Sequence, residues 1–240
     1  MRPLSPHDRV FVLTGAGISA ESGLPTFRGA DGLWRGRRAE EVATPQAFRA
    51  NSELVWQFYS ERRKRHASVV PNDAHRALAK LESALGERLF LCTQNVDSLH
   101  EQAGSKRVAH MHGRLMQTRC SRESCPTPPF DDERLYLTRA DIPTCPKCGA
   151  MLRPHICWFG EVPFGMDRIF AELRICTLLL TIGSSGVVEP AASFVRMARL
   201  NRARAVYIGP EEPANGEFFD EVLLGKADEV LPEMVQRLVA

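Results

Sequence analysis

Neither sign of charge is in excess in this chain: its 240 residues carry 31 basic and 29 acidic side chains, a net charge of +2. A balance this near neutral gives no electrostatic preference for nucleic acid or a membrane surface. The sequence also lacks an apolar run long enough to span a bilayer; its longest, residues 176–182, predicts a buried strand. Because residues 1–8 lack a basic-then-apolar signal, we expect a cytoplasmic protein that binds neither membranes nor nucleic acid directly.

Cysteine is odd in number, at seven, which argues against a complete disulfide framework. Three of the seven lie singly among apolar residues, as buried small hydrophobes do. The other four form two close pairs, Cys120 with Cys125 and Cys145 with Cys148, and Gly149 permits a tight turn after the second pair. Two such pairs separated by a loop predict a closed four-thiolate zinc site, with unrelated free thiols as the alternative. We expect one structural zinc ion that holds together a lobe too small for its own core.

Short apolar runs alternate with helical patterns along most of the chain. The runs that predict buried strands are residues 10–14, 88–93, 177–182 and 205–208. The helical patterns are residues 45–66, 73–85, 190–201 and 228–239. This alternation predicts an α/β fold built on a Rossmann-like, doubly wound parallel sheet, which binds ligands at the carboxyl ends of its strands.

Two regions break the alternation and predict a smaller inserted lobe. Residues 33–66 are helical and rich in arginine and aromatic side chains, and residues 114–157 hold the clustered cysteines. We therefore expect a Rossmann-like lobe over about residues 1–32, 67–113 and 158–240. The smaller zinc-binding and helical lobe takes about residues 33–66 and 114–157.

The first strand runs into a glycine turn, Gly15-Ala16-Gly17. A buried strand followed by such a turn is the geometry of a phosphate-binding loop. Ala20 replaces the third glycine of the usual dinucleotide fingerprint, so the pattern alone also fits a turn that binds no nucleotide. The segment Thr26-Phe27-Arg28 places a hydroxyl, an aromatic ring and a guanidinium after the loop, where a dehydrogenase would need only helix.

Polar residues follow the second predicted strand, in the order Gln94-Asn95-Val96-Asp97. An amide and a carboxylate at the carboxyl edge of a sheet can bind ribose hydroxyls or a carboxamide, and the same residues can instead cap a helix. Further along, His110 and His112 precede the first cysteine pair. A histidine beside a glycine is a candidate general base, although a lone histidine is more often structural.

In this order on one chain, the motifs resemble the sirtuin family of NAD-dependent protein deacylases, over about residues 10–239. Besides the four cysteines, the motifs are Gly15-Ala16-Gly17-Ile18-Ser19, Pro25-Thr26-Phe27-Arg28, Thr93-Gln94-Asn95-Val96-Asp97, His112-Gly113, Trp158-Phe159-Gly160-Glu161 and Gly183-Ser184-Ser185. The short N-terminus and compact zinc lobe are similar to those of bacterial members. The resemblance implies a single catalytic unit over residues 1–240.

The resemblance also implies how the chemistry would run. NAD would be consumed, with its pyrophosphate on the glycine loop and its nicotinamide end held by Asn95 and Asp97. His112 would act as general base on a ribose hydroxyl, and the products would be free lysine, nicotinamide and O-acyl-ADP-ribose. The residues expected to bind NAD are Gly15, Ala16, Gly17, Ala20, Thr26, Phe27, Arg28, Gln94, Asn95, Val96, Asp97, His112, Gly183, Ser184, Ser185 and Ala227.

The substrate would be an acylated protein or peptide. The segments Trp158-Phe159-Gly160-Glu161 and Val187-Val188-Glu189 resemble the strands with which sirtuins clamp the substrate peptide by backbone pairing.

One pair of residues suggests which acyl group is removed. Tyr59 and Arg62 stand three apart on a predicted helix and so share a face, where a phenol and a guanidinium can bind a carboxylate. In sirtuins this Tyr-x-x-Arg pair marks members that remove succinyl, malonyl or glutaryl groups, and Ala43 aligns with a pocket residue that is bulkier in pure deacetylases. The basic run 62–65 alone also fits a solvated helix end. We expect acidic acyl groups to be favoured and acetyl to be accepted.

Two departures from the sirtuin pattern affect the NAD site. The asparagine that often follows the last core strand and touches the adenosine ribose is replaced by Gly209-Pro210, with Glu211 as a possible substitute. The usual Gly-Thr-Ser is Gly183-Ser184-Ser185, which keeps the hydroxyl.

Rival activities remain open at this point. The same scaffold could be a plain deacetylase or a protein ADP-ribosyltransferase. A nicotinamide dehydrogenase would want an acidic residue about twenty positions after the glycine loop, at the end of a second strand, and residues 33–38 provide neither. A zinc-ribbon nucleic-acid binder would explain the cysteines but not the glycine loop or residues 94–97.

Overall fold

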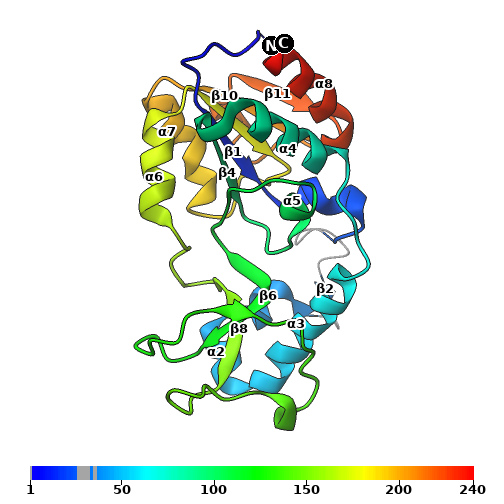
Figure 1. Ribbon diagram of the computed structural model, residues 1–240, viewed down its shortest axis with the longest axis vertical. Coiled ribbons are helices and arrows are strands. Elements are labelled where there is room, and N and C mark those ends of the chain that lie inside the picture. The colour runs from blue at the N-terminus through cyan, green and yellow to red at the C-terminus, as the bar shows by residue number, and fades with distance from the viewer. Residues whose placement is uncertain (1, 26–32, 35–36) are drawn as a thin grey trace. The chain divides into compact units, whose positions relative to one another are not determined.

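A computed structural model describes residues 2–25, 33–34 and 37–240 (Figure 1). The chain forms two compact units, each assembled from separate segments. The first contains Met1–Leu24, Val70–Met111 and Gly165–Ala240, and the second contains Pro25–Val69 and His112–Phe164.

The first unit is built on a parallel sheet whose strands lie in the order β11-β10-β9-β1-β4-β5. Their bounds are β1 (Val10–Thr14), β4 (Leu89–Thr93), β5 (Val108–His110), β9 (Leu178–Ile182), β10 (Arg204–Gly209) and β11 (Glu221–Leu224). Every residue of β1, β4 and β9 is buried. These three strands are continuous apolar runs because both faces of a parallel sheet are covered.

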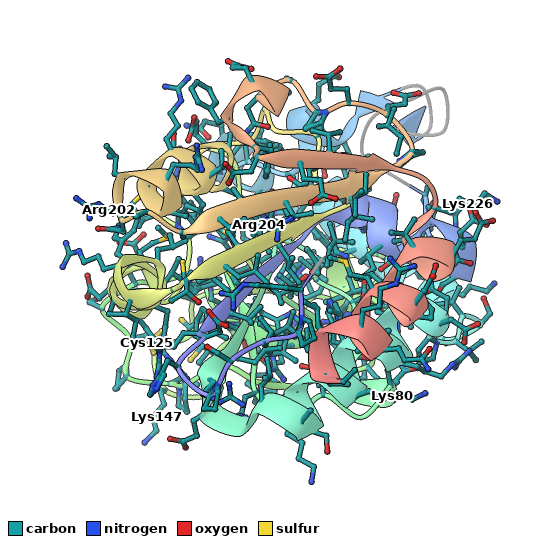
Figure 2. All side chains as sticks on the ribbon, turned by 90° about the horizontal axis from the view of Figure 1, so that it is seen from above. Lys80, Cys125, Lys147, Arg202, Arg204 and Lys226 are labelled. Carbon is teal, nitrogen blue, oxygen red and sulfur yellow. The ribbon has the colours of Figure 1, made fainter. Side chains whose placement is uncertain are left out.

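Helices cover both faces of this sheet. On one face α4 (Asp73–Leu85) and α8 (Ala227–Val239) share a core with Val12, and on the other α6 (Met166–Ile175) and α7 (Phe194–Leu200) share a core with Phe11. Neighbouring strand residues enter opposite cores because side chains alternate across a sheet. Figure 2 looks along the layers, with α6 and α7 on one side of the strands and α4 and α8 on the other.

Short elements complete the first unit, and three of them follow the carboxyl ends of β1, β4 and β9: η1 (Ala16–Ser22), α5 (Leu99–Gln102) and η5 (Ala191–Ser193). The other two, η3 (Gly86–Arg88) and η6 (Gly216–Phe218), precede β4 and β11. The chain adds β4 and β5 on one side of β1 and later adds β9, β10 and β11 on the other. The strand order therefore reverses between β1 and β9, and open α/β sheets bind nucleotides at the carboxyl ends of the strands beside such a reversal.

The second unit centres on a small antiparallel sheet, with β6 (Gly113–Cys120) between β7 (Phe130–Asp131) and β8 (Leu152–Ile156). The remaining elements are β2 (Leu33–Trp34), β3 (Arg37–Arg38), α1 (Ala39–Val42), α2 (Pro45–Ala50), α3 (Ser52–His66) and η4 (Arg139–Asp141). Helix α3 is fixed to this sheet by Arg63, which is buried, donates to the carbonyl of Leu115 over 2.9 Å and pairs with Asp132 at 3.6 Å. Within the basic run 62–65, Arg63 is thus a core residue and not part of a solvated helix end.

The predicted fold class, a doubly wound parallel sheet with a smaller zinc-binding and helical lobe, is confirmed. The single helix predicted over residues 45–66 is wrong, because Asn51 separates α2 from α3 and caps α3 by accepting the N–H of Leu54. The sequence also gave no indication of β5, β11 and α6 in the first unit or of the antiparallel strands in the second.

Candidate active site and metal centre

The turn after β1 packs directly against the turn after β9. Gly17 donates its N–H to the carbonyl of Gly183 over 2.9 Å, and Gly183 has a φ of +61°. A Cβ at Gly15 would lie 2.7 Å from the Gly183 oxygen, and one at Gly17 would lie 2.7 Å from the Gly183 Cα. Side chains are therefore excluded here, and a bare backbone at the carboxyl ends of β1 and β9 fits the close approach of a diphosphate. Ala16 and Ala20 lie in η1, which begins directly after Gly15.

Asn95 and Asp97 are buried and tied to that glycine turn. The Asn95 side-chain amide donates to the Gly15 carbonyl over 3.1 Å and to the Ser19 hydroxyl over 3.3 Å. Ser19 in turn donates to one Asp97 oxygen over 3.2 Å, while the other accepts the N–H of Leu99, the first residue of α5. The helix-capping interpretation is thus correct for one carboxylate oxygen of Asp97. The other oxygen belongs to a polar cluster, formed by Asn95, Ser19 and Asp97, beside the glycine turn.

Gln94 connects the loops that follow two different strands. Its side-chain amide donates to the Ser184 hydroxyl over 2.9 Å, so the end of β4 is linked to the loop after β9. Ser184 is buried, Val96 is half-buried and Ser185 is exposed. The structure therefore brings the predicted residues of the glycine turn, the loop after β4 and the loop after β9 to one edge of the sheet.

Two further predicted NAD contacts have different outcomes. Ala227 is buried as the first residue of α8, and Gly225 just before it donates its N–H to the carbonyl of Gly209. The segment Thr26-Phe27-Arg28 lies outside the described residues.

Two buried histidines that were not predicted support the polar cluster. His75 lies 3.4 Å from the Ser19 hydroxyl, and His100 lies 3.0 Å from the Thr14 hydroxyl. Burial lowers the pKa of His75 to about 4, with Asp97 opposing the shift, and lowers the pKa of His100 well below its usual value. Both imidazoles are therefore neutral near pH 7. Sequence reasoning missed them because only the packing of α4 against α5 brings their rings to 5.0 Å.

The structure distinguishes the two histidines near the end of β5. His110 donates its Nδ1 proton to the carbonyl of Asn95 over 3.1 Å, and its Nε2 lies 2.7 Å from Glu101 Oε1, so its ring has a structural role. His112 is half-buried and accepts the N–H of Cys157 on its backbone carbonyl over 2.9 Å. The role of His112 as general base remains a prediction.

Glycine at position 113 holds the backbone next to His112. A Cβ on Gly113, whose φ is +86°, would lie only 2.0 Å from the carbonyl oxygen of His155. Any other residue would push β6 away from β8 at the place where His112 precedes the sheet.

The residues predicted to bind the acyl group come together within the second unit. Tyr59 is 3% exposed, and its hydroxyl accepts the indole N–H of Trp158 over 2.9 Å. Burial raises the pKa of Tyr59 to about 12, against the nearby charge of Arg62, so the phenol keeps its proton. Arg62 is half-buried on the next turn of α3, and buried Ala43 accepts the N–H of Phe159 over 3.0 Å.

The segment 158–161 forms a turn, and its expected pairing with a substrate peptide remains a prediction. Glu161 donates its N–H to the carbonyl of Trp158, and its carboxylate accepts the N–H of Trp158 over 2.8 Å. Arg153 binds the same carboxylate at 2.6 and 2.9 Å, and its guanidinium carbon lies 3.3 Å from the centre of the Trp158 ring. Glu161 thus orients Trp158, while Phe159 is 44% exposed and Gly160 lies at the tip.

The segment 187–189 is likewise not a strand in this part of the described chain. Val188 accepts the N–H of Ala192, and Glu189 accepts the hydroxyl of Ser193 over 2.9 Å, so both lead into η5. Val187 is 45% exposed. In both segments, backbone groups form hydrogen bonds with residues nearby in the sequence, whereas a strand pairs with a second strand. Binding of a peptide by either segment remains a prediction.

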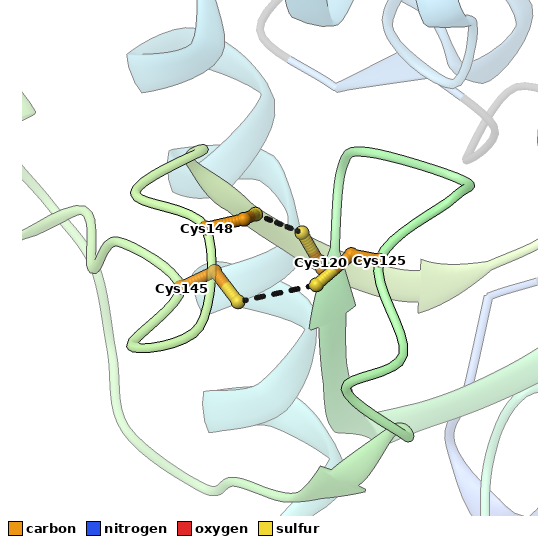
Figure 3. Close-up of side chains that lie close together, drawn as sticks. All are labelled: Cys120, Cys125, Cys145 and Cys148. Atoms are coloured by element: carbon orange, nitrogen blue, oxygen red, sulfur yellow. Dashed lines mark hydrogen bonds between the residues drawn. The ribbon is translucent and has the colours of Figure 1, made fainter.

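The four clustered cysteines form a metal centre (Figure 3). All four sulfur atoms lie within 4.8 Å of one another, with 3.5 Å between Cys120 and Cys148 and 3.7 Å between Cys125 and Cys145. A tetrahedron with Zn–S bonds of about 2.3 Å has sulfur atoms about 3.8 Å apart. The arrangement therefore fits one structural zinc ion and leaves no position for a catalytic water.

Comparisons with known proteins agree with this geometry. The sequence profile of the Sir2 family matches residues 15–190. The chain is 48% identical over 233 residues to an NAD-dependent protein deacylase of Escherichia coli strain K12, covering 96% of this chain and 82% of that protein. An NAD-dependent protein deacylase of Salmonella typhimurium is 46% identical over 240 residues, covering 97% and 85%.

Solved structures give the same result. A Sir2 homologue in complex with NAD has a TM-score of 0.87 at 42% identity, covering 96% of this chain and 90% of its own. A mutant Sir2 homologue in complex with 2′-O-acetyl ADP ribose has a TM-score of 0.88 at 42% identity, covering 96% and 91%.

Proposed function

The chain belongs to the Sir2 family and is an NAD-dependent protein deacylase, and from this premise we propose that it favours lysine acyl groups that end in a carboxylate. Succinyl, malonyl and glutaryl groups have this chemistry, and acetyl does not. Acetyl-lysine is also a substrate because a small group can enter a larger pocket. The rival activities on the same scaffold are plain deacetylation and ADP-ribosyl transfer.

The observation that carries the proposal is the hydrogen bond from Trp158 to Tyr59. A phenol has one proton to give and lone pairs that accept. Because the Trp158 N–H occupies the accepting side of the Tyr59 oxygen, the phenol proton is directed elsewhere, as a donor. Its pKa of about 12 keeps that proton in place at every physiological pH. A buried donor of this kind suits an anionic oxygen, and an acetyl methyl group offers none.

Arg62 supplies the charge that completes a carboxylate site. It follows Tyr59 by one turn of α3, so the two side chains share a face of the helix. A guanidinium can hold both oxygens of a carboxylate, and such charge-assisted bonds are about twice as strong as neutral ones. Ala43, which is buried and small, leaves space that a bulkier residue would take.

The catalytic roles follow from how the chain holds each side chain. We propose that His112 takes a proton from a ribose hydroxyl as general base, because it stands next to Gly113 in the motif that resembles the sirtuin pattern. Asn95 and Asp97 would bind the nicotinamide end of the dinucleotide, since their bonds to Gly15 and Ser19 fix both side chains. NAD, when bound, supplies the ribose that accepts the acyl group as nicotinamide leaves.

The partners of the reaction are acylated proteins or peptides. Exposed Phe159 and Val187 support peptide binding at the segments 158–161 and 187–189, where an extended peptide could pair with the backbone. No helix among the described residues is long and apolar enough to cross a membrane. We place the reaction in the cytoplasm, since all seven cysteines are described and none forms a disulfide, as in a reducing compartment, and we expect no direct contact with nucleic acid.

The test of the proposed function is a panel of acyl-lysine peptides supplied with NAD and followed by mass spectrometry. Exchange of Arg62→Met should raise the Michaelis constant (KM) for succinyl-lysine at least tenfold, because a charge-assisted bond contributes about 1.5–3 kcal/mol. The KM for acetyl-lysine should change less than twofold.

Two exposed residues of the same basic run provide the matched control. Lys64→Met and Arg65→Met remove a nearby positive charge from the same helix turn and should leave both KM values unchanged. Equal losses on succinyl- and acetyl-lysine in Arg62→Met would rule out the carboxylate preference while leaving deacylation intact.

A further inference from the structure

The imidazole of His110 lies between two elements of the first unit. His110 ends β5, which pairs with β4 through Thr93, and its side chain is 4% exposed. Its Nδ1 lies 3.1 Å from the carbonyl oxygen of Asn95, and its Nε2 lies 2.7 Å from Oε1 of Glu101 in α5. The ring therefore connects α5 to the segment 94–97, which follows β4.

Both ring nitrogens face groups that accept hydrogen bonds. The Asn95 carbonyl offers only lone pairs, and an ionised Glu101 carboxylate has no proton either. A neutral imidazole has a single N–H and could fill only one of the two bonds. The Glu101–His110 pair therefore holds one proton more than a neutral ring and a carboxylate would, and a distance of 2.7 Å is typical of such charge-assisted bonds. Because Glu101 engages one proton of the ring, the other is kept on Nδ1, where it reaches Asn95.

The carbonyl that His110 binds belongs to the segment expected to hold nicotinamide. Asn95 donates its own N–H to the Thr93 hydroxyl over 3.0 Å and its side-chain amide to the Gly15 carbonyl over 3.1 Å. Neither of these bonds fixes the next peptide unit along the chain. A peptide unit is planar, so a bond to its oxygen sets the direction in which the chain continues toward Asp97. The bond from His110 has this effect.

We propose that Glu101 and His110 are a positioning pair for the nicotinamide end of NAD. His110 holds the Asn95 carbonyl, and Glu101 orients the ring that does so. Together they keep the side chains of Asn95 and Asp97 in the arrangement that binds nicotinamide, and they act through these two residues. This inference rests on the role proposed above for Asn95 and Asp97.

Two substitutions at position 110 separate the two contacts of the ring. The side-chain amide of asparagine can place an N–H where Nδ1 lies, whereas the longer glutamine places it where Nε2 lies. His110→Asn therefore keeps a donor for the Asn95 carbonyl, and His110→Gln keeps one only for Glu101. His110→Gln should raise the KM for NAD and the inhibition constant of nicotinamide about fivefold or more, the effect of one lost hydrogen bond to a buried carbonyl. His110→Asn should change both constants by less than about twofold.

Binding of ADP-ribose, measured by calorimetry, is the matched readout, because this molecule lacks nicotinamide. Its affinity should stay within about twofold of that of the original chain in both variants, since the glycine turns expected to bind the diphosphate are unchanged. A ring that merely packs the first unit would give a different result, with affinity for ADP-ribose lost in parallel. Thermal melting of each variant checks that the first unit is folded.

Substitutions in α5 test whether Glu101 orients the ring. Glu101→Ala should raise the inhibition constant of nicotinamide about threefold, because the ring proton is no longer directed to Nδ1. Glu101→Gln should restore the original value, since its amide can donate to Nε2 and so leaves the ring proton on Nδ1. Gln102→Ala is the control, because it removes the neighbouring exposed side chain of the same helix and should change neither constant.

The outcomes separate this inference from the proposed function. Equal effects of His110→Asn and His110→Gln on nicotinamide, or no effect of either, would overturn the inference. Asn95→Ala should itself raise the inhibition constant of nicotinamide. If it does so while His110→Gln does not, the positioning pair alone is wrong. If Asn95→Ala leaves the constant unchanged, the proposed role of Asn95 is wrong and the inference fails with it.

Discussion

At the scale of single residues, the acyl site depends on how a buried phenol is oriented by its neighbours. Trp158 donates to Tyr59, and the Trp158 ring is itself held by the guanidinium of Arg153. Glu161 binds both Arg153 and the backbone N–H of Trp158. Trp158 is therefore a positioning residue, because it acts on the substrate through Tyr59.

This arrangement predicts a selective effect of Trp158→Phe. The exchange keeps an aromatic ring but removes the N–H, so the Tyr59 hydroxyl is free to rotate. KM for succinyl-lysine should rise about fivefold, the value of one neutral hydrogen bond, while kcat and the KM for acetyl-lysine stay within twofold. Steady-state kinetics on the two peptides measures the split. A uniform loss on both would indicate that Trp158 only packs the second unit.

His112→Tyr is expected to separate binding from chemistry. Loss of a general base costs about 10²–10⁴ in rate, whereas the peptide contacts proposed for residues 158–161 and 187–189 do not involve the imidazole. Steady-state formation of the deacylated peptide should fall by at least a hundredfold while fluorescence anisotropy shows unchanged peptide affinity. Ordinary turnover by this variant would remove His112 from the mechanism.

The residues that could be predicted from the sequence are those that belong to short motifs with a characteristic spacing. The cysteine pairs, the glycine turn and the segment 94–97 each have a pattern within a few positions. His75, His100 and Arg63 have no such pattern, because their partners lie on segments far along the chain. A lone buried histidine looks the same in sequence whatever it contacts.

At the scale of elements, the small sheet of the second unit is held by α3 and by the metal centre. Trp56 of α3 donates to the carbonyl of Leu152 in β8 over 3.1 Å, and Arg63 donates to that of Leu115 in β6. Cys120 ends β6, pairs with Leu152 and shares the metal centre with the Cys145–Cys148 turn. The zinc ion therefore reinforces the end of the sheet that Trp56 also contacts.

Removal of the metal should unfold this sheet selectively. Cys145→Ser is expected to lower bound zinc below half an equivalent and to abolish hydrogen-exchange protection in β6 and β8, because such small units draw most of their stability from the metal. Protection of β1, β4 and β9 should persist, since these strands have their own core. Cys157→Ser is the control, as this half-buried thiol lies outside the cluster. Full protection in the zinc-free variant would contradict the prediction.

The elements that the sequence predicted well are those buried on both faces. The four predicted strands of the first unit agree with β1, β4, β9 and β10 to within one residue at each end. The antiparallel strands of the second unit were not predicted, because β6 mixes charged, polar and apolar residues and is held by thiolates and by Arg63. The segments 158–161 and 187–189 are not strands in the described chain, and their expected pairing with a substrate peptide remains a prediction.

At the scale of the whole molecule, buried imidazoles make stability depend on pH. The pKa of His75 is about 4 in the folded chain, against about 6.5 when unfolded, and that of His100 is also lowered. Between these values the unfolded chain binds more protons, so the free energy of unfolding falls as the pH drops from about 6.5 toward 4. Each imidazole contributes a slope of about 1.4 kcal/mol per pH unit in this window.

The substitution His75→Gln should reduce the pH dependence of the free energy of unfolding by the contribution of about one proton. Urea unfolding of the original chain and the variant at pH 8 gives the baseline, and the same measurement at pH 5 gives the difference. If the free energy of unfolding changed with pH equally in both proteins, His75 would have the same pKa in the folded and the unfolded chain, and the prediction would be wrong.

The interleaved order of the two units has a consequence for how the protein is made. β1 is translated before the second unit, yet one of its two sheet neighbours, β9, is translated only after the whole second unit. The final helix, α8, then closes the core over α4, and Leu4 donates its N–H to Leu238 near the end of the chain. The parallel sheet of the first unit thus cannot be completed until the residues that follow the second unit have been made, so a chain truncated within the second unit would lack β9, β10 and β11.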